Sequence, residues 1–338
     1  MSGKALVCLG AAVLLGLCGG VSAKVTLPRF DLEAHRGGRD LWPENTLDSF
    51  RHAVALGAST LEMDVQITKD GIPVLSHSYQ LEAYLAKDAQ GRWVRKGHEP
   101  AFHNLTLAQV KRYDVGSINP AADPDYWHDH GRLQEPSPGE RVPTLDEMFT
   151  MVEGTGNQTV RFDIETKSYA HLPDNTVNPD PQKFVKLIMD VVHQHHMENR
   201  VILESFDWRT LLEARRQDKN TTTSALTCEV PEWGSEGLYR YEKSPGCSPY
   251  MAGLDIKDFG MDWVKASHAV YADIVSPYYK ELTPQYVLEC HQLGMKMVPW
   301  TVDTRAEMIQ IMDMGVDGII TDRPDLLRDL LNERHIPY

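Results

Sequence analysis

The chain has 338 residues, of which 42% are hydrophobic and 24% are charged. This is enough for one large domain, such as a barrel of about 250 residues that carries insertions. Acidic residues outnumber basic ones by 48 to 34, a formal net charge of −14. A nucleic-acid partner is therefore not expected, because a phosphate backbone needs a basic surface. A small phosphate-containing substrate stays compatible with this charge, since a local metal site can override the global field.

The first segment is predicted to be an export signal. Lys4 precedes an uncharged run over residues 5–17, and Val21, Ser22 and Ala23 supply a cleavage site. The run is short for a membrane span, and no second apolar run follows it. We expect cleavage near Ala23 and a periplasmic or secreted domain over residues 24–338 without a stable membrane span; a retained anchor is the alternative.

Short apolar segments alternate with helix-like stretches, as in repeated βα units. Eight candidate strands begin near Phe30, Leu61, Val160, Val201, Thr222, Asp273, Met297 and Gly318. This α/β pattern predicts a closed (β/α)8 TIM barrel rather than an open sheet. Residues 84–141 interrupt the pattern with Pro, Gly, His, Trp and Asp, and indicate an insertion in a strand–helix loop. Such loops at the C-terminal face of a barrel usually shape the active site.

Several of these strands are predicted to point charged side chains into the barrel. In residues 61–67, period-two alternation places Glu62 and Asp64 on one face and apolar residues on the other. Residues 161–167 repeat the pattern with Glu165 and Lys167, and His35 shares a face with two acids at residues 31 and 33. Barrel interiors are normally apolar, and buried charges need a partner or a metal. The pattern therefore favours a functional site.

Glu62, Asp64 and Glu165 are predicted to converge near the mouth of the barrel. Three carboxylates would repel one another in a low-dielectric site. Ligation by oxygen alone suits one hard divalent ion, Ca²⁺ or Mg²⁺, rather than zinc. The alternative is an ion-pair network with the nearby cations Arg36, Arg161 and Lys167.

Two histidines at strand ends are candidates for acid–base catalysis. His35 follows the first strand, and His77 follows a strand-like run over residues 72–76. One could protonate a leaving alkoxide while the other deprotonates the nucleophile. The other histidines are weaker candidates: His193, His195 and His196 are typical of a solvated helix end, and His128 and His130 lie in the insertion.

Three cysteines lie beyond the predicted signal segment. Cys228 and Cys247 share a loop-like stretch, and an oxidising compartment would allow them to form a disulfide. Cys290 lies in a helix-like segment, where we expect a buried thiol.

Ordered motifs along nearly the whole mature chain resemble those of the glycerophosphodiester phosphodiesterases. The matching segments are His35-Arg36-Gly37, Pro43-Glu44-Asn45-Thr46, Glu62-Met63-Asp64-Val65, Thr68-Lys69-Asp70-Gly71, Val74-Leu75-Ser76-His77, Pro143-Thr144-Leu145-Asp146-Glu147, Glu165-Thr166-Lys167, Trp300-Thr301-Val302-Asp303 and residues 315–324. The resemblance implies a TIM barrel with an insertion after the second strand. It also implies hydrolysis of a small-molecule glycerophosphodiester to glycerol 3-phosphate and an alcohol.

Carried over by position, the resemblance also implies roles for individual residues. His35 and His77 become the acid–base pair, and the metal ligands are Glu62, Asp64 and Glu165. Arg36 and Lys167 would hold phosphate oxygens, and Glu44 would support the site. Phe206 and Trp300 would form an apolar wall against the glycerol carbons.

One departure from the family pattern concerns His77. The family usually has Asp directly after the second histidine, and here Ser78 takes that place.

Two other functions are alternatives to hydrolysis of small glycerophosphodiesters. They are a phospholipase-D-like lipid hydrolase on the same barrel and a catalytically silent exported binding protein. A nucleotide-dependent oxidoreductase is disfavoured, because no Gly-rich loop is present. The preferred alcohol and the oligomeric state are left open.

Overall fold

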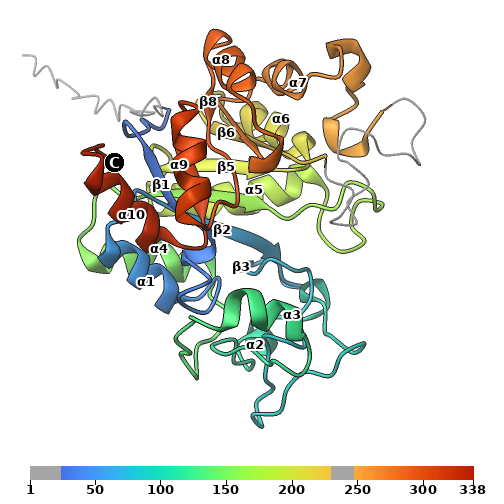
Figure 1. Ribbon diagram of the computed structural model, residues 1–338. Coiled ribbons are helices and arrows are strands. Elements are labelled where there is room, and N and C mark those ends of the chain that lie inside the picture. Colours follow the sequence, from blue (N-terminus) through green and yellow to red (C-terminus); the bar gives the residue numbers. More distant parts are fainter. Residues whose placement is uncertain (1–23, 230–246) are drawn as a thin grey trace, which may run out of the picture.

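The computed structural model describes residues 24–229 and 247–338 (Figure 1). The predicted signal segment therefore lies outside the described residues. In the part that is described, no helix is both long and apolar enough to cross a membrane.

Eight parallel strands form the barrel, and their neighbour order is β8-β7-β6-β5-β4-β2-β1-β9. They are β1 (Asp31–Ala34), β2 (Thr60–Ile67), β4 (Arg161–Thr166), β5 (Val201–Ser205), β6 (Thr222–Thr227), β7 (Ile274–Pro277), β8 (Lys296–Met297) and β9 (Gly318–Thr321). Backbone hydrogen bonds close the barrel between β8 and β9, from Asp317 N to Met297 O (2.9 Å) and from Ile320 N to Pro299 O (3.0 Å). The predicted (β/α)8 barrel is confirmed, and each observed strand starts within one residue of its expected position.

Each barrel strand is followed, before the next, by a helix on the outside. These helices are α1 (Leu47–Leu56), α4 (Leu145–Thr155), α5 (Pro181–Gln194), α6 (Trp208–Gln217), α7 (Trp263–Ala269), α8 (Pro284–Gln292), α9 (Arg305–Asp313) and α10 (Pro324–Glu333). Side-chain caps fix several starts: Thr46 and Thr144 each accept a hydrogen bond from the backbone three residues on, in a capping box.

The two faces of the strands differ as the alternation predicts. Leu61, Met63 and Phe162 belong to the large apolar cluster between strands and helices. Glu62 and Asp163 lie on the opposite, inner face, and burial together with the other inner carboxylates raises the pKa of both. Close packing between β1 and β9 requires Gly318, because a Cβ atom there would come within 2.6 Å of the Asp31 Cβ.

A short segment before β1 closes the N-terminal end of the barrel. Val25 and Leu27 pack against four inner apolar residues, Ile202, Ile274, Val298 and Ile320. The Val25 amide also donates to Thr222 Oγ1 at 2.9 Å. The opposite, C-terminal end of the barrel is therefore the end open to a ligand.

The chain between β2 and α4 forms a separate lobe beneath the C-terminal ends of the strands (Figure 1). It begins with β3 (Pro73–Leu75), which pairs antiparallel with β2, and contains α2 (Leu107–Val110), α3 (Pro124–Tyr126) and the π-helix η3 (Trp127–Gly131). We call residues 76–143 the insertion. Its own apolar cluster, which includes Leu81, Phe102 and Val110, is distinct from the barrel core.

Two sequence expectations outside the site need correction. No disulfide joins Cys228 to Cys247; the first is buried and the second is exposed. His195 is not solvated like the exposed His193 and His196, because it bridges two carboxylates of α4. Cys290 is a buried thiol in α8, as expected, and burial raises its pKa to about 12.

Candidate active site

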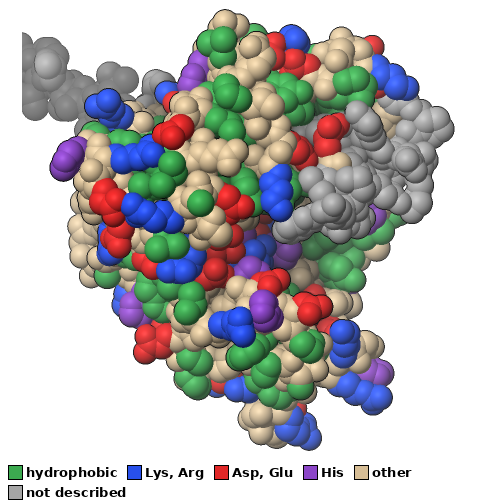
Figure 2. Space-filling view, in the orientation of Figure 1, with side chains coloured by type: hydrophobic (Ala, Val, Ile, Leu, Met, Phe, Trp, Pro, Cys, Tyr) green, Lys and Arg blue, Asp and Glu red, His purple; other side chains and the backbone are tan. Residues whose placement is uncertain are grey.

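A cavity of about 460 Å³ lies at the C-terminal ends of the barrel strands. Figure 2 shows the surface hollowed between the barrel and the insertion, with basic and histidine side chains in the hollow. The lining includes His35, Arg36, Arg39, Glu62, His77, Tyr84, Tyr126, His130, Glu165, Lys167, Phe206 and Trp300. Cavities of this size hold small molecules. The C-terminal face of a TIM barrel is also where its enzymes carry their active sites.

The structure brings the three predicted carboxylates together. Glu62, Asp64 and Glu165 each offer an oxygen within 4.8 Å of the others, and all three are buried. Adjacent strands place them, since β2 and β4 pair in parallel with Asp64 opposite Glu165. These three carboxylates could hold a hard cation, because each metal-ligand atom that they offer is an oxygen.

Two cations flank this carboxylate group. Arg36 Nε lies 3.3 Å from Asp64 Oδ2, and Lys167 Nζ lies 2.9 Å from Glu165 Oε1 and 3.6 Å from Asp64 Oδ1. Arg36 adopts the left-handed conformation at φ 51°, which is uncommon for a residue with a side chain. This turn also lets its backbone N–H donate to Glu62 Oε2 at 2.7 Å.

Burial and charge set the ionisation of the three carboxyl groups differently. Burial and the neighbouring Asp64 and Glu204 raise the pKa of Glu62 well above its usual value. Burial also raises the pKa of Glu165 to about 7, although Lys167 opposes the shift. For Asp64, Arg36 and Lys167 outweigh burial and lower the pKa. The carboxylate group thus needs added positive charge to ionise fully at neutral pH.

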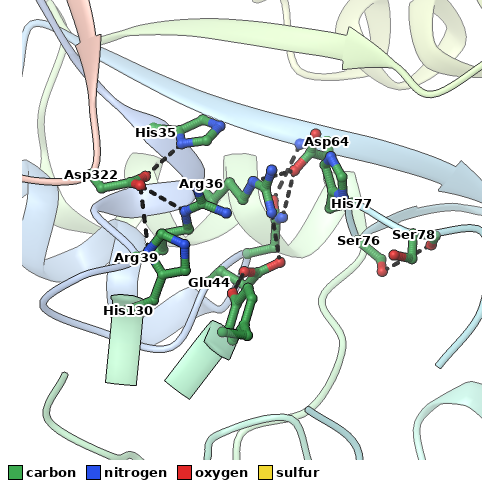
Figure 3. A network of polar contacts seen from close by, with 12 residues as sticks. His35, Arg36, Arg39, Glu44, Asp64, Ser76, His77, Ser78, His130 and Asp322 are labelled. Carbon is green, nitrogen blue, oxygen red and sulfur yellow. Dashed lines mark hydrogen bonds and ion pairs between the residues drawn. The ribbon is translucent and has the colours of Figure 1, made fainter. Parts of the chain in front are cut away.

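His35 is held by a carboxylate from the far end of the chain. Its Nδ1 lies 2.5 Å from Asp322 Oδ1, and Asp322 Oδ2 accepts from Arg39 Nε at 2.8 Å (Figure 3). Burial lowers the pKa of His35 to about 4, against the opposing effect of Asp322. Because an ionised carboxylate only accepts hydrogen bonds, Nδ1 carries the proton and Nε2 is left as an acceptor. Nε2 is 3.9 Å from Glu62 Oε2.

His77 lines the same cavity, but its ring is held differently. Within residues 24–229 and 247–338, no hydrogen-bond partner of the imidazole is present, and the His77 carbonyl accepts from Gln66 Nε2 at 3.2 Å. Burial and then the cations Arg36 and Lys167 lower its pKa well below the usual value. Ser78 lines a smaller neighbouring pocket instead of the main cavity.

The remaining predicted residues also lie around the cavity. Glu44 Oε1 accepts from Arg36 Nη1 at 3.2 Å and is buried. Phe206 and Trp300 form an edge-to-face pair with ring centroids 5.6 Å apart. Their rings make one apolar wall of the cavity, and Lys167 Nζ lies 5.9 Å from the Phe206 ring centroid.

Sequence reasoning gave no role in this site to Arg39, Tyr126 or Asp322, and it ranked His130 low. Asp322 stands in the matched motif at residues 315–324, so its position directly after the last strand was the available signal. His130 was a weak candidate in the insertion, and the structure places it on Asp40 at 2.7 Å and near Asp322 at 3.7 Å. No pattern in the sequence points to Tyr126.

A closed (β/α)8 barrel with carboxylates, cations and histidines at its C-terminal face has the groups that metal-assisted hydrolysis of a phosphate ester requires. The model of the glycerophosphoryl diester phosphodiesterase family matches residues 35–326. The chain therefore belongs to this family and is a phosphoric diester hydrolase.

Individual relatives agree with this assignment. The glycerophosphodiester phosphodiesterase of Caldanaerobacter subterraneus subsp. tengcongensis is 28% identical over 300 residues, which are 89% of this chain and 97% of the relative. Glycerophosphodiester phosphodiesterase 1 of Bos taurus is 30% identical over 276 residues, 80% of this chain and 71% of the relative.

Solved structures share the fold. A protein of Silicibacter pomeroyi DSS-3 assigned as a glycerophosphoryl diester phosphodiesterase superposes with a TM-score of 0.76 at 29% identity, covering 94% of this chain and 97% of that one. A phosphodiesterase of Oleispira antarctica, solved with the product sn-glycerol-3-phosphate, has a TM-score of 0.64 at 19% identity and covers 90% and 97%.

Proposed function

We propose that this enzyme hydrolyses small glycerophosphodiesters to glycerol 3-phosphate and an alcohol, with one divalent cation and two histidines. The observation that carries the proposal is that the carboxylate group of Glu62, Asp64 and Glu165 lies at one cavity, which Glu62 and Glu165 line together with His35 and His77. The names of the curated relatives support the substrate class.

The carboxylate group fits a hard cation. Its donors are oxygen only, which suits Ca²⁺ or Mg²⁺. Asp64 Oδ1 is buried without a hydrogen-bond partner among the described residues, although the Lys167 ammonium lies 3.6 Å away. When bound, the cation would stabilise negative charge on the nonbridging phosphate oxygens.

Arg36 and Lys167 would bind the remaining phosphate oxygens, because they are the cations that flank the carboxylate group. Glu44 holds the Arg36 guanidinium by its Nη1 atom, which fixes the direction of the other donors. Phe206 and Trp300 would pack against the carbon atoms of glycerol.

The hydrogen bond of His35 supports a role for this residue as the base. Asp322 fixes the proton on Nδ1, so Nε2 can accept a proton from the nucleophilic hydroxyl. His77, which lines the same cavity, would then protonate the leaving alkoxide. The nucleophile is the glycerol 2-hydroxyl, which gives a cyclic phosphate that water opens, or water itself.

The same proposal includes export. The apolar segment over residues 5–17 and the small residues before Lys24 support a signal peptide that is cleaved near Ala23. The mature enzyme would then act in a periplasmic or extracellular space on diesters from degraded lipids.

The test is release of glycerol 3-phosphate from glycerophosphocholine by purified residues 24–338. We expect turnover with Ca²⁺ or Mg²⁺ and its loss with a chelator. We also expect His35→Ala and His77→Ala each to lower kcat by about 10²–10⁴-fold with folding intact. His128→Ala is the control, because His128 is exposed and does not line the cavity.

No release with either ion would overturn the substrate class. Turnover that a chelator leaves unchanged would refute the metal assignment, and full activity in both active-site variants would refute the acid–base assignment.

A further inference from the structure

One short segment of the insertion contacts two groups of active-site residues, one around Arg36 and one around His35. It consists of α3 and η3 (Pro124–Gly131), and its residues Tyr126 and His130 line the cavity with Tyr84. We propose that Tyr126 and His130 are positioning residues, Tyr126 for the phosphate-binding Arg36 and His130 for the base His35. This inference rests on the proposed function and extends it from the barrel to the insertion.

Tyr126 acts through Glu44. Its hydroxyl donates a hydrogen bond to Glu44 Oε2, while the other oxygen of Glu44 accepts from Arg36 Nη1 at 3.2 Å. Arg36 in turn lies 3.3 Å from Asp64. Glu44 is only 6% exposed, so water cannot easily replace the tyrosine hydroxyl. The chain of contacts runs from the insertion to a predicted metal ligand.

His130 acts through Asp322 and Asp40. Its Nδ1 lies 2.7 Å from Asp40 Oδ1 and 3.7 Å from Asp322 Oδ2. Asp322 is fully buried and holds both His35 Nδ1 and Arg39 Nε (Figure 3). The carboxylate that orients the His35 ring therefore lies next to a side chain of the insertion.

Packing holds the two residues in one arrangement. The Tyr126 ring lies 4.4 Å from the Tyr84 ring and 4.8 Å from the His130 ring, measured between centroids. Further along the insertion, Gln134 Nε2 donates to the Arg39 carbonyl at 2.7 Å. The Glu135 amide likewise donates to the Leu41 carbonyl at 2.8 Å. Hydrogen bonds thus join the insertion to the loop that carries Arg39 and Asp40.

The two positions should affect different kinetic constants. Tyr126→Phe keeps the ring stack and removes only the hydroxyl, so Arg36 loses support. We expect KM to rise by roughly three- to tenfold with a smaller change in kcat. His130→Ala removes the neighbour of Asp322, and we expect kcat to fall by about threefold or more with little change in KM. His130→Asn keeps a donor near the position of Nδ1 and should recover part of kcat.

The experiment measures kcat and KM for glycerophosphocholine with saturating metal, together with the melting temperature of each variant. Tyr113→Phe and His128→Ala are the matched controls. Tyr113 packs on the apolar cluster of the insertion, and His128 is an exposed residue of η3. Neither lines the cavity.

A rise in KM for Tyr126→Phe, a fall in kcat for His130→Ala and recovery in His130→Asn would support the inference. Kinetics equal to those of the controls would overturn it, and so would losses that only follow a lower melting temperature. An inactive wild-type enzyme would instead refute the proposed function. Failure of this inference and failure of the proposed function therefore give different results.

Discussion

At the scale of single residues, Asp322 fixes which nitrogen of His35 carries the proton, and the proposed mechanism uses the other nitrogen as the base. Replacement by Asn would remove the acceptor-only carboxylate and allow the amide N–H to face the ring, which favours the opposite tautomer. We expect Asp322→Asn to lower kcat by about 10²-fold or more with a smaller effect on KM. The measurement is steady-state release of glycerol 3-phosphate.

Asp313→Asn is a suitable control for this variant. Asp313 is an exposed residue at the end of α9, and its partner is Arg334 on the surface. Unchanged kcat in Asp322→Asn would show that the hydrogen bond does not set the reactivity of His35.

At the scale of secondary-structure elements, His195 links two helices. At the C-terminal end of α5 its ring nitrogens lie 3.0 Å from Asp146 and 3.1 Å from Glu153, both on α4. Burial lowers the pKa of His195, but the two carboxylates outweigh it and raise the pKa above its usual 6.5. A raised folded-state pKa stabilises the protein below about pH 6.5, and this stabilisation is lost as the pH rises through the folded-state pKa.

We therefore expect His195→Gln to lower the free energy of unfolding at pH 5.5. The loss should not exceed about 1 kcal/mol, because both carboxylate partners of His195 are partly exposed. The loss should be smaller at pH 8.5. Urea unfolding at both pH values measures it. His193→Gln, at an exposed position of the same helix, should show no such difference. A larger loss at high pH would contradict the assigned ion pairs.

At the scale of the whole molecule, the insertion and the barrel have separate apolar cores. Phe102 is buried in the cluster of the insertion, and Phe149 is buried between α4 and the barrel. Truncation of a buried Phe to Ala costs about 3–5 kcal/mol. We expect Phe102→Ala to act mainly on the insertion, with faster hydrogen exchange over residues 76–143 and lower turnover.

Phe149→Ala provides the matched comparison, since it should lower the stability of the barrel strands themselves. Hydrogen exchange followed by mass spectrometry separates the two effects. Equal acceleration in the barrel and the insertion for Phe102→Ala would mean that the two cores unfold together.

The sequence alone determined the barrel and the inward carboxylates. The period of two along a strand is a property of the backbone, so Glu62 and Asp64 had to share a face, and apolar neighbours defined the other face. Parallel strands end at one edge, which placed His35, Lys167 and Phe206 at the same mouth.

Only the tertiary structure decided which side chains meet there. Asp322 reaches His35 across 287 positions of sequence, and His130 reaches Asp40 across 90. These contacts depend on the closure of the barrel and on the path of the insertion, which local patterns do not encode. The disulfide that the sequence allowed between Cys228 and Cys247 is not formed, because nearness in the chain does not set where each sulfur lies in the fold. The backbone period sets where a side chain points, whereas the folded packing sets what it touches.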